Sequence, residues 1–594
     1  MIQDIFSVIA NQGWFIFDVV LLFIVCGIST GVLLRIIFDD QLTSTEYLSL
    51  AMAGWILPAS LISILWFLLG SKLSASLNLF ILSSLFIISI FFLLRLKPDL
   101  EPDSKSTALS LLLFFLISLL LRLAFVSKAI LPSYFDSASH YLEIKGILGN
   151  NTTGLITSLT SNYYHLGFHF IAAFMSSIFH VNIANAMLII GQMVLAVMPI
   201  SFFFLIKHET GSNGAGLFTV IISAFGWYMP AHAVDWGKYP ALMSLGLIPF
   251  VLSLAYLLSQ YKDKLSQQKR WGLYTFLGIG ILVSGFVHSR SLVIFGIAFI
   301  AWIIAIWQQK LPVWQRGILF FIVVAAIILE IIYIQNQDVL GLLFDPYVPK
   351  GIWITALVLF LSVFALRSFP RIVFTCLLTI SFLLGSLFIP VLGLIPGHEN
   401  LTLLDRPFVE MILFLPLSII GGLGLAGLEK VLQAKNIRLI SSNGFVSLIA
   451  CGLVLTNAYA TYDLYPATCC VLASPDDVTA IDWIANHIPA DAYIGISATE
   501  LKVLTSGSFE GYVGGDAGIW VTPLSNRFTI PLLYDTDFSE QATLDSLCQS
   551  GISHLYIGEL GQNFDDSQLS VQPAWYKVLL SMPEVKVYEV VGCK

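Results

Sequence analysis

A first group of polar residues directly follows an apolar run at positions 108–127. Asp136, His140 and Glu143 are spaced i, i+4 and i+7, so on a helix they lie on one face. A carboxylate there could accept the proton of an acceptor hydroxyl or help to bind a divalent metal. The spacing of Ser133 and Asp136 also fits a helix-capping box, and this structural alternative stays open.

Two histidines, His165 and His169, lie one helical turn apart further along the chain. Their imidazoles could contact a phosphate or polarise a leaving group. Tyr163 and Tyr164 precede them, and Tyr and His are also typical of the aromatic belt at a membrane–water interface. An interfacial belt is therefore the structural alternative.

Three basic residues, Lys238, Arg290 and Arg406, lie in short polar connections between apolar runs. Arginine suits a phosphate because its planar fork can bind two oxygens. The polar connections also supply acidic residues, namely Asp136, Asp235 and Glu399. We therefore predict a site for an anionic substrate with an acid–base partner. The structural alternative is that neighbouring residues such as Asp405 and Arg406 form an ion pair with each other.

The elements that carry these residues must lie in or against a membrane. Of the 594 residues, 57% are hydrophobic and 11% are charged, whereas globular proteins have about 45–50% apolar and about 25% charged residues. The mean hydropathy is +0.86. A soluble fold cannot bury so much apolar side chain, and the net charge of −8 does not suit a nucleic-acid partner. Composition thus excludes a soluble enzyme, a nucleic-acid binder and a disordered scaffold.

The apolar runs predict about 14 membrane-spanning helices, because a span needs roughly 20 apolar residues. They lie near 15–37, 48–70, 75–94, 108–127, 183–206, 214–230, 241–259, 272–287, 291–307, 317–334, 351–367, 371–394, 407–428 and 439–460. Segment 163–180 is apolar but short and interrupted by polar residues. We predict that it is an interfacial helix in an external loop at 128–182.

Basic residues in short loops set the orientation, since they favour the cytosolic side. The basic connections at 261–270, 308–316, 367–371 and 429–438 all fall on one side if the predicted spans alternate. The protein is therefore predicted to lie in the cytoplasmic (plasma) membrane. Its candidate site and its C-terminal tail would both be extracytoplasmic.

The tail differs in composition from the rest of the chain. Residues 461–594 contain 5 Lys and Arg against 17 Asp and Glu, whereas residues 1–460 carry a net charge of +4. Short β-like runs alternate with a helical pattern at 476–487, which predicts a small soluble domain. The β-like runs lie at 492–497, 553–558 and 585–591. Outside the cytosol, four cysteines could form one or two disulfides, and these are Cys469, Cys470, Cys548 and Cys593.

The predicted fold is thus a mainly α polytopic membrane protein with about 14 transmembrane helices and a C-terminal soluble α/β domain. Its motifs resemble, in their order, those of the GT-C superfamily of polytopic membrane glycosyltransferases, which use polyprenyl-phosphate-linked sugars. Three stretches carry the resemblance: Phe135-Asp136-Ser137 with His140-Tyr141, Tyr164-His165-Leu166-Gly167-Phe168-His169-Phe170-Ile171-Ala172-Ala173, and Val234-Asp235-Trp236-Gly237-Lys238-Tyr239-Pro240.

The resemblance covers about residues 108–594 and implies three parts of the chain. Residues 1–107 would be additional N-terminal transmembrane helices, residues 108–460 the family's core, and residues 461–594 the extracytoplasmic domain. The chain lacks the Asp-x-Asp and Trp-Trp-Asp motifs of oligosaccharyltransferases at the matching places, so N-glycosylation is not expected.

The resemblance implies a glycosyltransferase that moves a hexosyl or pentosyl group from a polyprenyl-phosphate donor to a hydroxyl of a glycan, lipid or protein acceptor. Asp136 would be the base or a metal-assisted orienter, with His140 and Asp235 as further catalytic candidates. The donor phosphate would be bound by Lys238, Arg290, Arg406, His165 and His169. A divalent cation such as Mg or Mn, if used, would be bound by Asp136, Glu143 and Asp235.

Two other classes of function stay open. A transporter or flippase for a lipid-linked or anionic substrate fits the number of spans, but polar residues on one side only, without paired broken helices, argue against it. A ligase would move a preassembled glycan, and an assembly scaffold would move nothing. The sequence has no phosphate-binding P-loop, no His-Glu-x-x-His helix and no Gly-x-Ser-x-Gly elbow.

Overall fold

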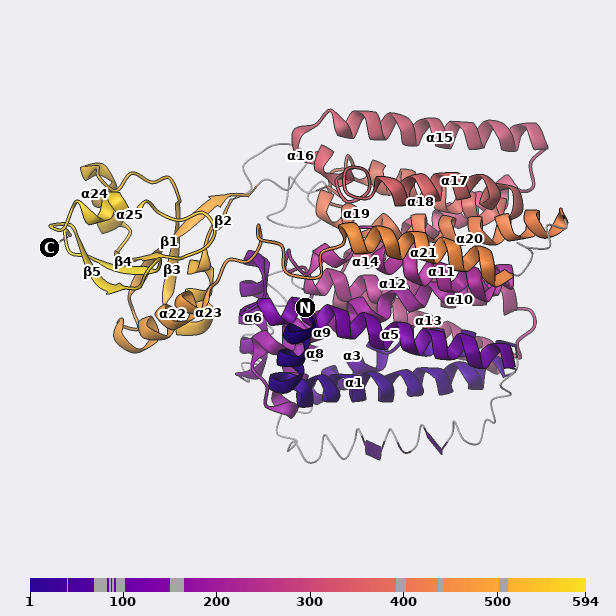
Figure 1. Ribbon diagram of the computed structural model, residues 1–594, viewed down its shortest axis with the longest axis horizontal. Helices are drawn as coiled ribbons and strands as arrows, with labels where there is room; N and C mark the ends of the chain where they lie inside the picture. Colours follow the sequence, from indigo (N-terminus) through magenta and orange to yellow (C-terminus); the bar gives the residue numbers. More distant parts are fainter. Residues whose placement is uncertain are drawn as a thin grey trace.

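The computed structural model describes residues 1–39, 41–68, 102–149, 165–391, 402–435, 443–501 and 511–593, with a few single positions between 83 and 91. Long helices run side by side in one bundle, and a smaller domain with a β-sheet stands at one end of it (Figure 1). The architecture is therefore the predicted one, a helical polytopic protein with a C-terminal α/β domain.

Ten helical stretches in the described part of the chain are long and apolar enough to cross a membrane. They are α1 (Ile2–Phe38), α2 (Ser44–Ala53) with α3 (Ile56–Leu68), α5 (Pro102–Lys128), α9 (Ile183–Val197) with η1 (Met198–Ile200) and α10 (Ser201–Thr210), α12 (Tyr239–Tyr261), α13 (Gln267–Val287), α14 (Arg290–Gln308), α15 (Val313–Gln335), α19 (Arg406–Ile412) with α20 (Phe414–Ala434), and α21 (Asn443–Thr461).

Three shorter apolar helices coincide with three further predicted spans. They are α11 (Asn213–Phe225), α17 (Ile352–Ser368) and α18 (Pro370–Ser386). Thirteen of the fourteen predicted spans are thus confirmed as apolar helices, and the remaining one, 75–94, lies almost wholly outside the described residues. The short elements α16 (Asp338–Gly341) and η3 (Leu342–Phe344) follow α15.

The bundle is held by one continuous apolar core that includes the N-terminal helices α1 to α3. Helices α17 and α20 approach most closely where glycines face a backbone. A Cβ on Gly424 or Gly427 would lie 2.4 Å from the carbonyl oxygen of Leu361 or Phe364. Small residues allow such close helix packing in membranes, where the hydrophobic effect does not drive helices together.

The contacts at the two ends of α1 show which parts of the chain lie at each end of the bundle. Near its start, Asp4 accepts a hydrogen bond of 2.7 Å from Tyr465 of the tail. At its other end, about 55 Å away for a helix of this length, Asp39 pairs with Lys269. The basic connection 261–270 therefore lies at the end opposite the C-terminal domain, as the charge pattern predicts.

Two shorter helices, α6 (Tyr134–Leu148) and α8 (Gly167–Phe179), lie at the end next to the C-terminal domain (Figure 1). With 13 residues, α8 is too short to cross a bilayer of about 30 Å. Its interfacial position stays a prediction, and nearly all of α8 is buried against α3, α6 and α9. For example, the rings of Phe174 and Trp66 lie 5.8 Å apart.

The C-terminal domain is built on a six-stranded mixed sheet of order β2-β1-β4-β6-β5, with β3 also paired to β1. Strands β3 and β4 run parallel to β1, and the other pairs are antiparallel. The strands are β1 (Tyr493–Glu500), β2 (Tyr512–Gly514), β3 (Phe528–Leu533), β4 (Ile552–Ile557), β5 (Tyr576–Ser581) and β6 (Lys586–Val590). The three predicted strands are β1, β4 and β6.

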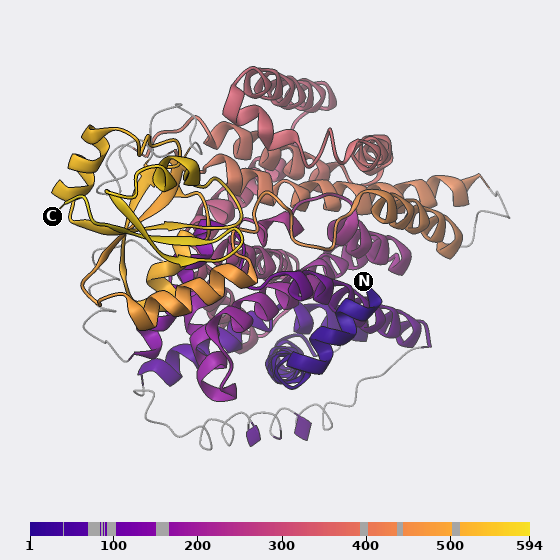
Figure 2. The ribbon, with the colours of Figure 1, turned by 60° about the vertical axis from the view of Figure 1, so that its left-hand side comes forward.

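Short helices complete this domain, which Figure 2 shows in front of the ends of the bundle helices. They are α22 (Pro475–His487), η4 (Ala517–Trp520), α23 (Val521–Ser525), α24 (Gln541–Gln549) and α25 (Asp566–Ser570). The predicted helix is α22, and Ser474 begins it with a capping box. Both disulfides join cysteines of the tail, Cys548 with Cys593 and the adjacent Cys469 with Cys470.

Two fully buried carboxyl groups, Asp477 and Asp516, lie inside this domain. Asp477 accepts a hydrogen bond of 2.6 Å from Tyr556. Burial, aided by the charge of Asp477, raises the pKa of Asp516 to about 7, although hydrogen bonds from the backbone N–H groups of Gly558 and Gly518 oppose the rise. The folded domain therefore holds a proton at Asp516 that the unfolded chain, with an ordinary value of 3.8, releases.

This proton makes stability depend on pH. Below about pH 4 both states are protonated; between about pH 4 and 7 only the folded state keeps the proton, so stability falls as the pH rises. The total loss should be about 2–4 kcal/mol. Hydrogen exchange of β1 and β4 in the purified full chain should show this slope, and Asp516→Asn should flatten it. Asp482→Asn, at an exposed carboxylate, is the control; an unchanged slope in Asp516→Asn would refute the assignment.

Candidate active site

The start of α6 and the connection before α12 meet at an ion pair between Asp136 and Lys238. The two side chains are 20% and 31% exposed, so a ligand can reach them. Burial acts to lower the pKa of Lys238, but the nearby carboxylates of Asp136 and Asp405 outweigh it and raise that pKa. Lys238 is therefore a charged ammonium at the centre of the cluster.

Asp136 does not cap its helix. Ser133 occupies the N-cap position of α6 and makes no side-chain capping bond, and its Oγ has no partner among the described residues. The capping-box alternative is thus wrong for this helix. The backbone N–H of Tyr134 instead donates a hydrogen bond of 2.9 Å to the carbonyl of Cys470, so the tail fixes the start of α6.

A glycine sets the approach of the second connection. Gly237 has φ +64°, and a Cβ on it would lie 2.3 Å from Ser137 Oγ and 2.8 Å from the carbonyl oxygen of Ser133. Only glycine fits both the conformation and the contact. The turn therefore lies directly against α6, and the next residue, Lys238, reaches Asp136.

The other two predicted cations are also paired with carboxylates. Arg290 Nη2 lies 2.6 Å from Asp405 Oδ2, and Arg406 Nη1 lies 2.9 Å from Glu410 Oε2. The predicted alternative of a pair between Asp405 and Arg406 is therefore wrong. Asp405 has a second role, since it caps α19 by accepting a hydrogen bond from the N–H of Phe408.

These cations stand where helices begin. Lys238 is the N-cap residue of α12, Arg290 is the first residue of α14, and Arg406 is the first residue of α19. Helix N-termini carry partial positive charge and unpaired N–H groups, which favour anions. The ion-paired carboxylates leave little net charge, so an incoming anion must displace at least one of them.

Four histidines belong to the same cluster as these ion pairs. His140 Nδ1 is 3.1 Å from His169 Nε2, and the rings of His165 and His288 are 4.6 Å apart. Burial, with the charge of Lys238 nearby, lowers the pKa of His140 to about 3, and burial with the charge of Arg290 lowers that of His165 to about 4. Both imidazoles are therefore neutral near pH 7 and can hydrogen-bond a ligand but add no positive charge.

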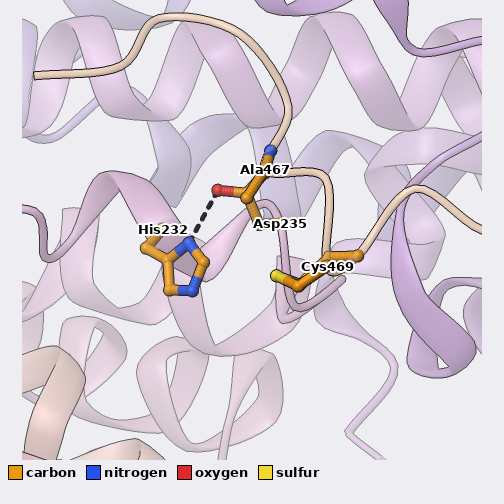
Figure 3. The surroundings of a disulfide bond; sticks show 5 residues. His232, Asp235, Ala467 and Cys469 are labelled. Carbon is orange, nitrogen blue, oxygen red and sulfur yellow. Dashed lines mark hydrogen bonds and ion pairs between the residues drawn. A yellow bond between two sulfur atoms is a disulfide. The ribbon is translucent and has the colours of Figure 1, made fainter.

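Asp235, three residues before Lys238, has hydrogen-bond partners of its own. Its Oδ2 lies 2.8 Å from His232 Nδ1, and its Oδ1 accepts a hydrogen bond of 2.7 Å from the N–H of Ala467 (Figure 3). The Cys469–Cys470 disulfide lies beside the same imidazole. Asp235 thus joins the connection before α12 to the tail, and its catalytic role stays a prediction.

The predicted metal ligands do not form a common site. Asp136 is occupied by Lys238, Asp235 by His232 and Ala467, and burial raises the pKa of Glu143, which disfavours its charged form. Among the described residues, the one compact group of metal-ligand types is His232, Cys469 and Cys470. Its two sulfurs are bonded to each other in the disulfide, so neither is available as a thiolate. Neither the predicted ligands nor the group of His232 with the two cysteines therefore fits a bound divalent cation.

Six of the eight predicted catalytic and phosphate-binding residues thus belong to one cluster with shared partners: Asp136, Lys238, Arg290, His140, His165 and His169. Arg406 lies beside it, 5.9 Å from the ring centre of Trp236. Three residues named in the sequence analysis, Tyr163, Tyr164 and Glu399, lie outside the described residues. Sequence reasoning assigned no site role to Asp405, Glu410 and His288. Asp405 and His288 lie in the same polar connections, and Glu410 lies one turn into the next predicted span.

The site combines a partly exposed carboxylate with positive charge at three helix starts, under a soluble domain at one end of a membrane-type bundle. Residues 49–389 match the model of a family of unknown function, DUF6541. Since this match covers more than half of the chain, the protein belongs to that family. The matched region includes Asp136, Lys238 and Arg290 but neither Arg406 nor the C-terminal domain. No curated protein matches the sequence.

A solved structure with a similar course of the chain is the single-particle cryo-EM structure of arabinofuranosyltransferase AftD from mycobacteria. The TM-score is 0.47 at 13% sequence identity, and the match covers 81% of this chain and 40% of the AftD chain. The neighbour is a glycosyltransferase by name, as the sequence resemblance leads one to expect. A likeness at this level carries no argument about the reaction.

The turn geometry gives a direct test. Gly237→Ala should strain the left-handed residue by about 1–2 kcal/mol and push the turn away from α6. We expect a lower thermal unfolding temperature in detergent and loss of the Asp136–Lys238 pair. Gly278→Ala is the matched control, because a Cβ there meets no atom within 4 Å. Equal unfolding temperatures for both variants would contradict the packing described for Gly237.

Proposed function

We propose that the protein is a membrane glycosyltransferase that moves a sugar from a polyprenyl-phosphate donor to an acceptor hydroxyl on the extracytoplasmic side of the membrane. The observation that carries the proposal is the pairing of a partly exposed carboxylate, Asp136, with an ammonium, Lys238, beside Arg290. The order of motifs shared with the GT-C superfamily supports the same reaction class.

In the proposed reaction the acceptor oxygen attacks the anomeric carbon of the donor sugar. A new bond forms between that carbon and the acceptor oxygen, and the bond from the carbon to the phosphate oxygen breaks. The acceptor proton passes to the carboxylate of Asp136, and polyprenyl phosphate leaves with the bonding electron pair. Lys238 and Arg290 stabilise the charge that grows on this phosphate in the transition state.

The ion pairs suggest how binding of the donor is coupled to transfer of the acceptor proton. While Lys238 is bound to Asp136, the ammonium occupies the carboxylate, which is then not free to contact an acceptor hydroxyl. A donor phosphate that takes Lys238 as its partner would release Asp136 toward the acceptor. The base would then become effective only when the donor is bound, which limits the reaction to complete complexes.

The test uses purified full-length protein in nanodiscs, labelled polyprenyl-phosphate sugars of hexose and pentose type, and release of polyprenyl phosphate as the readout. Asp136→Asn should keep donor binding but turn over about 10²–10⁴ times more slowly, as expected for loss of a general base. Lys238→Met should instead weaken donor binding. Asp482→Asn, in an exposed carboxylate of the C-terminal domain, is the control.

Turnover near the wild-type rate in Asp136→Asn, with normal expression, would leave Asp136 as a structural partner of Lys238 and refute its role as the base. Transfer of a preassembled glycan in place of one sugar would identify a ligase. Movement of the donor across the membrane without release of polyprenyl phosphate would identify a flippase, and either result would overturn the proposal.

The proposed sidedness is tested separately by single cysteines in a background without Cys26, Cys376 and Cys451. An impermeant maleimide applied to intact cells should label Asp482→Cys in the tail but not Lys264→Cys in the basic connection until the membrane is permeabilised. The reason is the preference of basic loops for the cytosol. Equal labelling of both positions in intact cells, or the reverse order, would contradict an extracytoplasmic site.

A further inference from the structure

Arg122, near the end of α5, is the one lysine or arginine in the described part of the chain that is buried, with 4% of its surface exposed. Its guanidinium lies 5.8 Å from the ring centre of Phe225 and 6.0 Å from that of Tyr462. Among the described residues, its Nε has no hydrogen-bond partner and no carboxylate lies within ion-pair distance of it. A buried charge without a counter-ion is costly, and contacts with ring faces offset only part of that cost.

Arg122 lines a small, partly open pocket between α5, α9 and the start of the tail. Two more unpartnered groups line this pocket, the amide nitrogen of Gln192 and the hydroxyl of Tyr462. Gln192 is 2% exposed. The guanidinium, the amide NH₂ and the hydroxyl can all donate hydrogen bonds, so the pocket presents donors that need acceptor oxygens.

The acidic residues of the pocket are already engaged. Asp235 is bonded to His232 and to the N–H of Ala467, and Asp463 accepts a hydrogen bond of 2.9 Å from the N–H of Tyr465. Lys350 does not line the pocket, but its Nζ lies 4.2 Å from the ring centre of Tyr228, which does. The unpartnered donors of the pocket therefore call for a bound oxyanion with several acceptor oxygens.

We propose that this pocket binds a phosphate group through Arg122 and Gln192, either on a lipid or as free phosphate. The arginine fork suits a phosphate because two parallel N–H groups can bind two of its oxygens. The pocket lies at the outer ends of α5 and α21, where a lipid headgroup would be. The proposal does not need the transferase reaction, and it concerns a site separate from the Asp136–Lys238 pair.

The test measures binding to the purified full chain in detergent by thermal unfolding and by equilibrium titration. The probes are citronellyl phosphate, inorganic phosphate and uncharged citronellol. We expect the wild type to be stabilised by a phosphate probe but not by citronellol. Affinity should fall at least about tenfold in Arg122→Met, with Arg122→Lys in between because it keeps the charge but not the fork.

Arg371→Met is the matched control, because Arg371 also lies over an aromatic ring, 4.8 Å from the ring centre of Trp302, but at the basic end of the bundle. The Arg122 dependence should persist in a Lys238→Met background, which separates this site from the proposed donor site. Preference for citronellyl phosphate would identify a lipid source, and equal binding of both phosphates a free one. Phosphate binding that is absent, or unchanged in both Arg122 variants, would overturn the proposal.

Discussion

At the end of the bundle next to the C-terminal domain, the geometry depends on the ion pair between Asp136 and Lys238. A half-exposed pair of this kind contributes little stability by itself, about 0–1 kcal/mol. Its position is fixed by the backbone, because Gly237 must lie against Ser133 and Ser137 in a left-handed conformation. The start of α6, the turn before α12 and the charges of the cluster therefore determine one another.

Helix α6 also connects this cluster to the C-terminal domain. His140, Ile144 and Ile147 are buried toward the bundle, where His140 meets His169. On another side, Tyr141 packs edge-on against Trp520 at 5.6 Å, and Lys145 donates hydrogen bonds of 2.7 Å to Pro523 and Asn526. A displacement of the soluble domain would therefore shift α6 and with it Asp136. This coupling is a structural reason for the domain to lie next to the site.

The linker before that domain also joins the domain to the site. Ala467 bonds Asp235, and Cys470 bonds Tyr134, so one short stretch contacts both connections that form the site. The adjacent disulfide Cys469–Cys470 lies within this stretch. The same stretch borders the pocket of Arg122 through Tyr462 and Asp463. This stretch thus borders both the Asp136–Lys238 cluster and the pocket of Arg122.

Hydropathy predicted the helices well because burial in lipid requires a long apolar run, and such runs are local in sequence. Pairings were harder: Asp405 contacts Arg290, not its neighbour Arg406, since only the folded bundle brings α14 beside α19. The same pattern of a serine three residues before an aspartate caps α22 but not α6, where Lys238 takes the carboxylate. Arg122 has no signal in the sequence, because a single arginine near the end of a span usually reaches the interface.

The measurement that tests the account most directly is a cryo-EM structure of the full chain with a non-hydrolysable polyprenyl-phosphate sugar analogue. The account predicts that the analogue's phosphate contacts Lys238 or Arg290, that the Asp136–Lys238 pair opens, and that the sugar lies next to Asp136. An analogue bound at the basic end of the bundle, or a donor phosphate seated elsewhere with the pair intact, would contradict it.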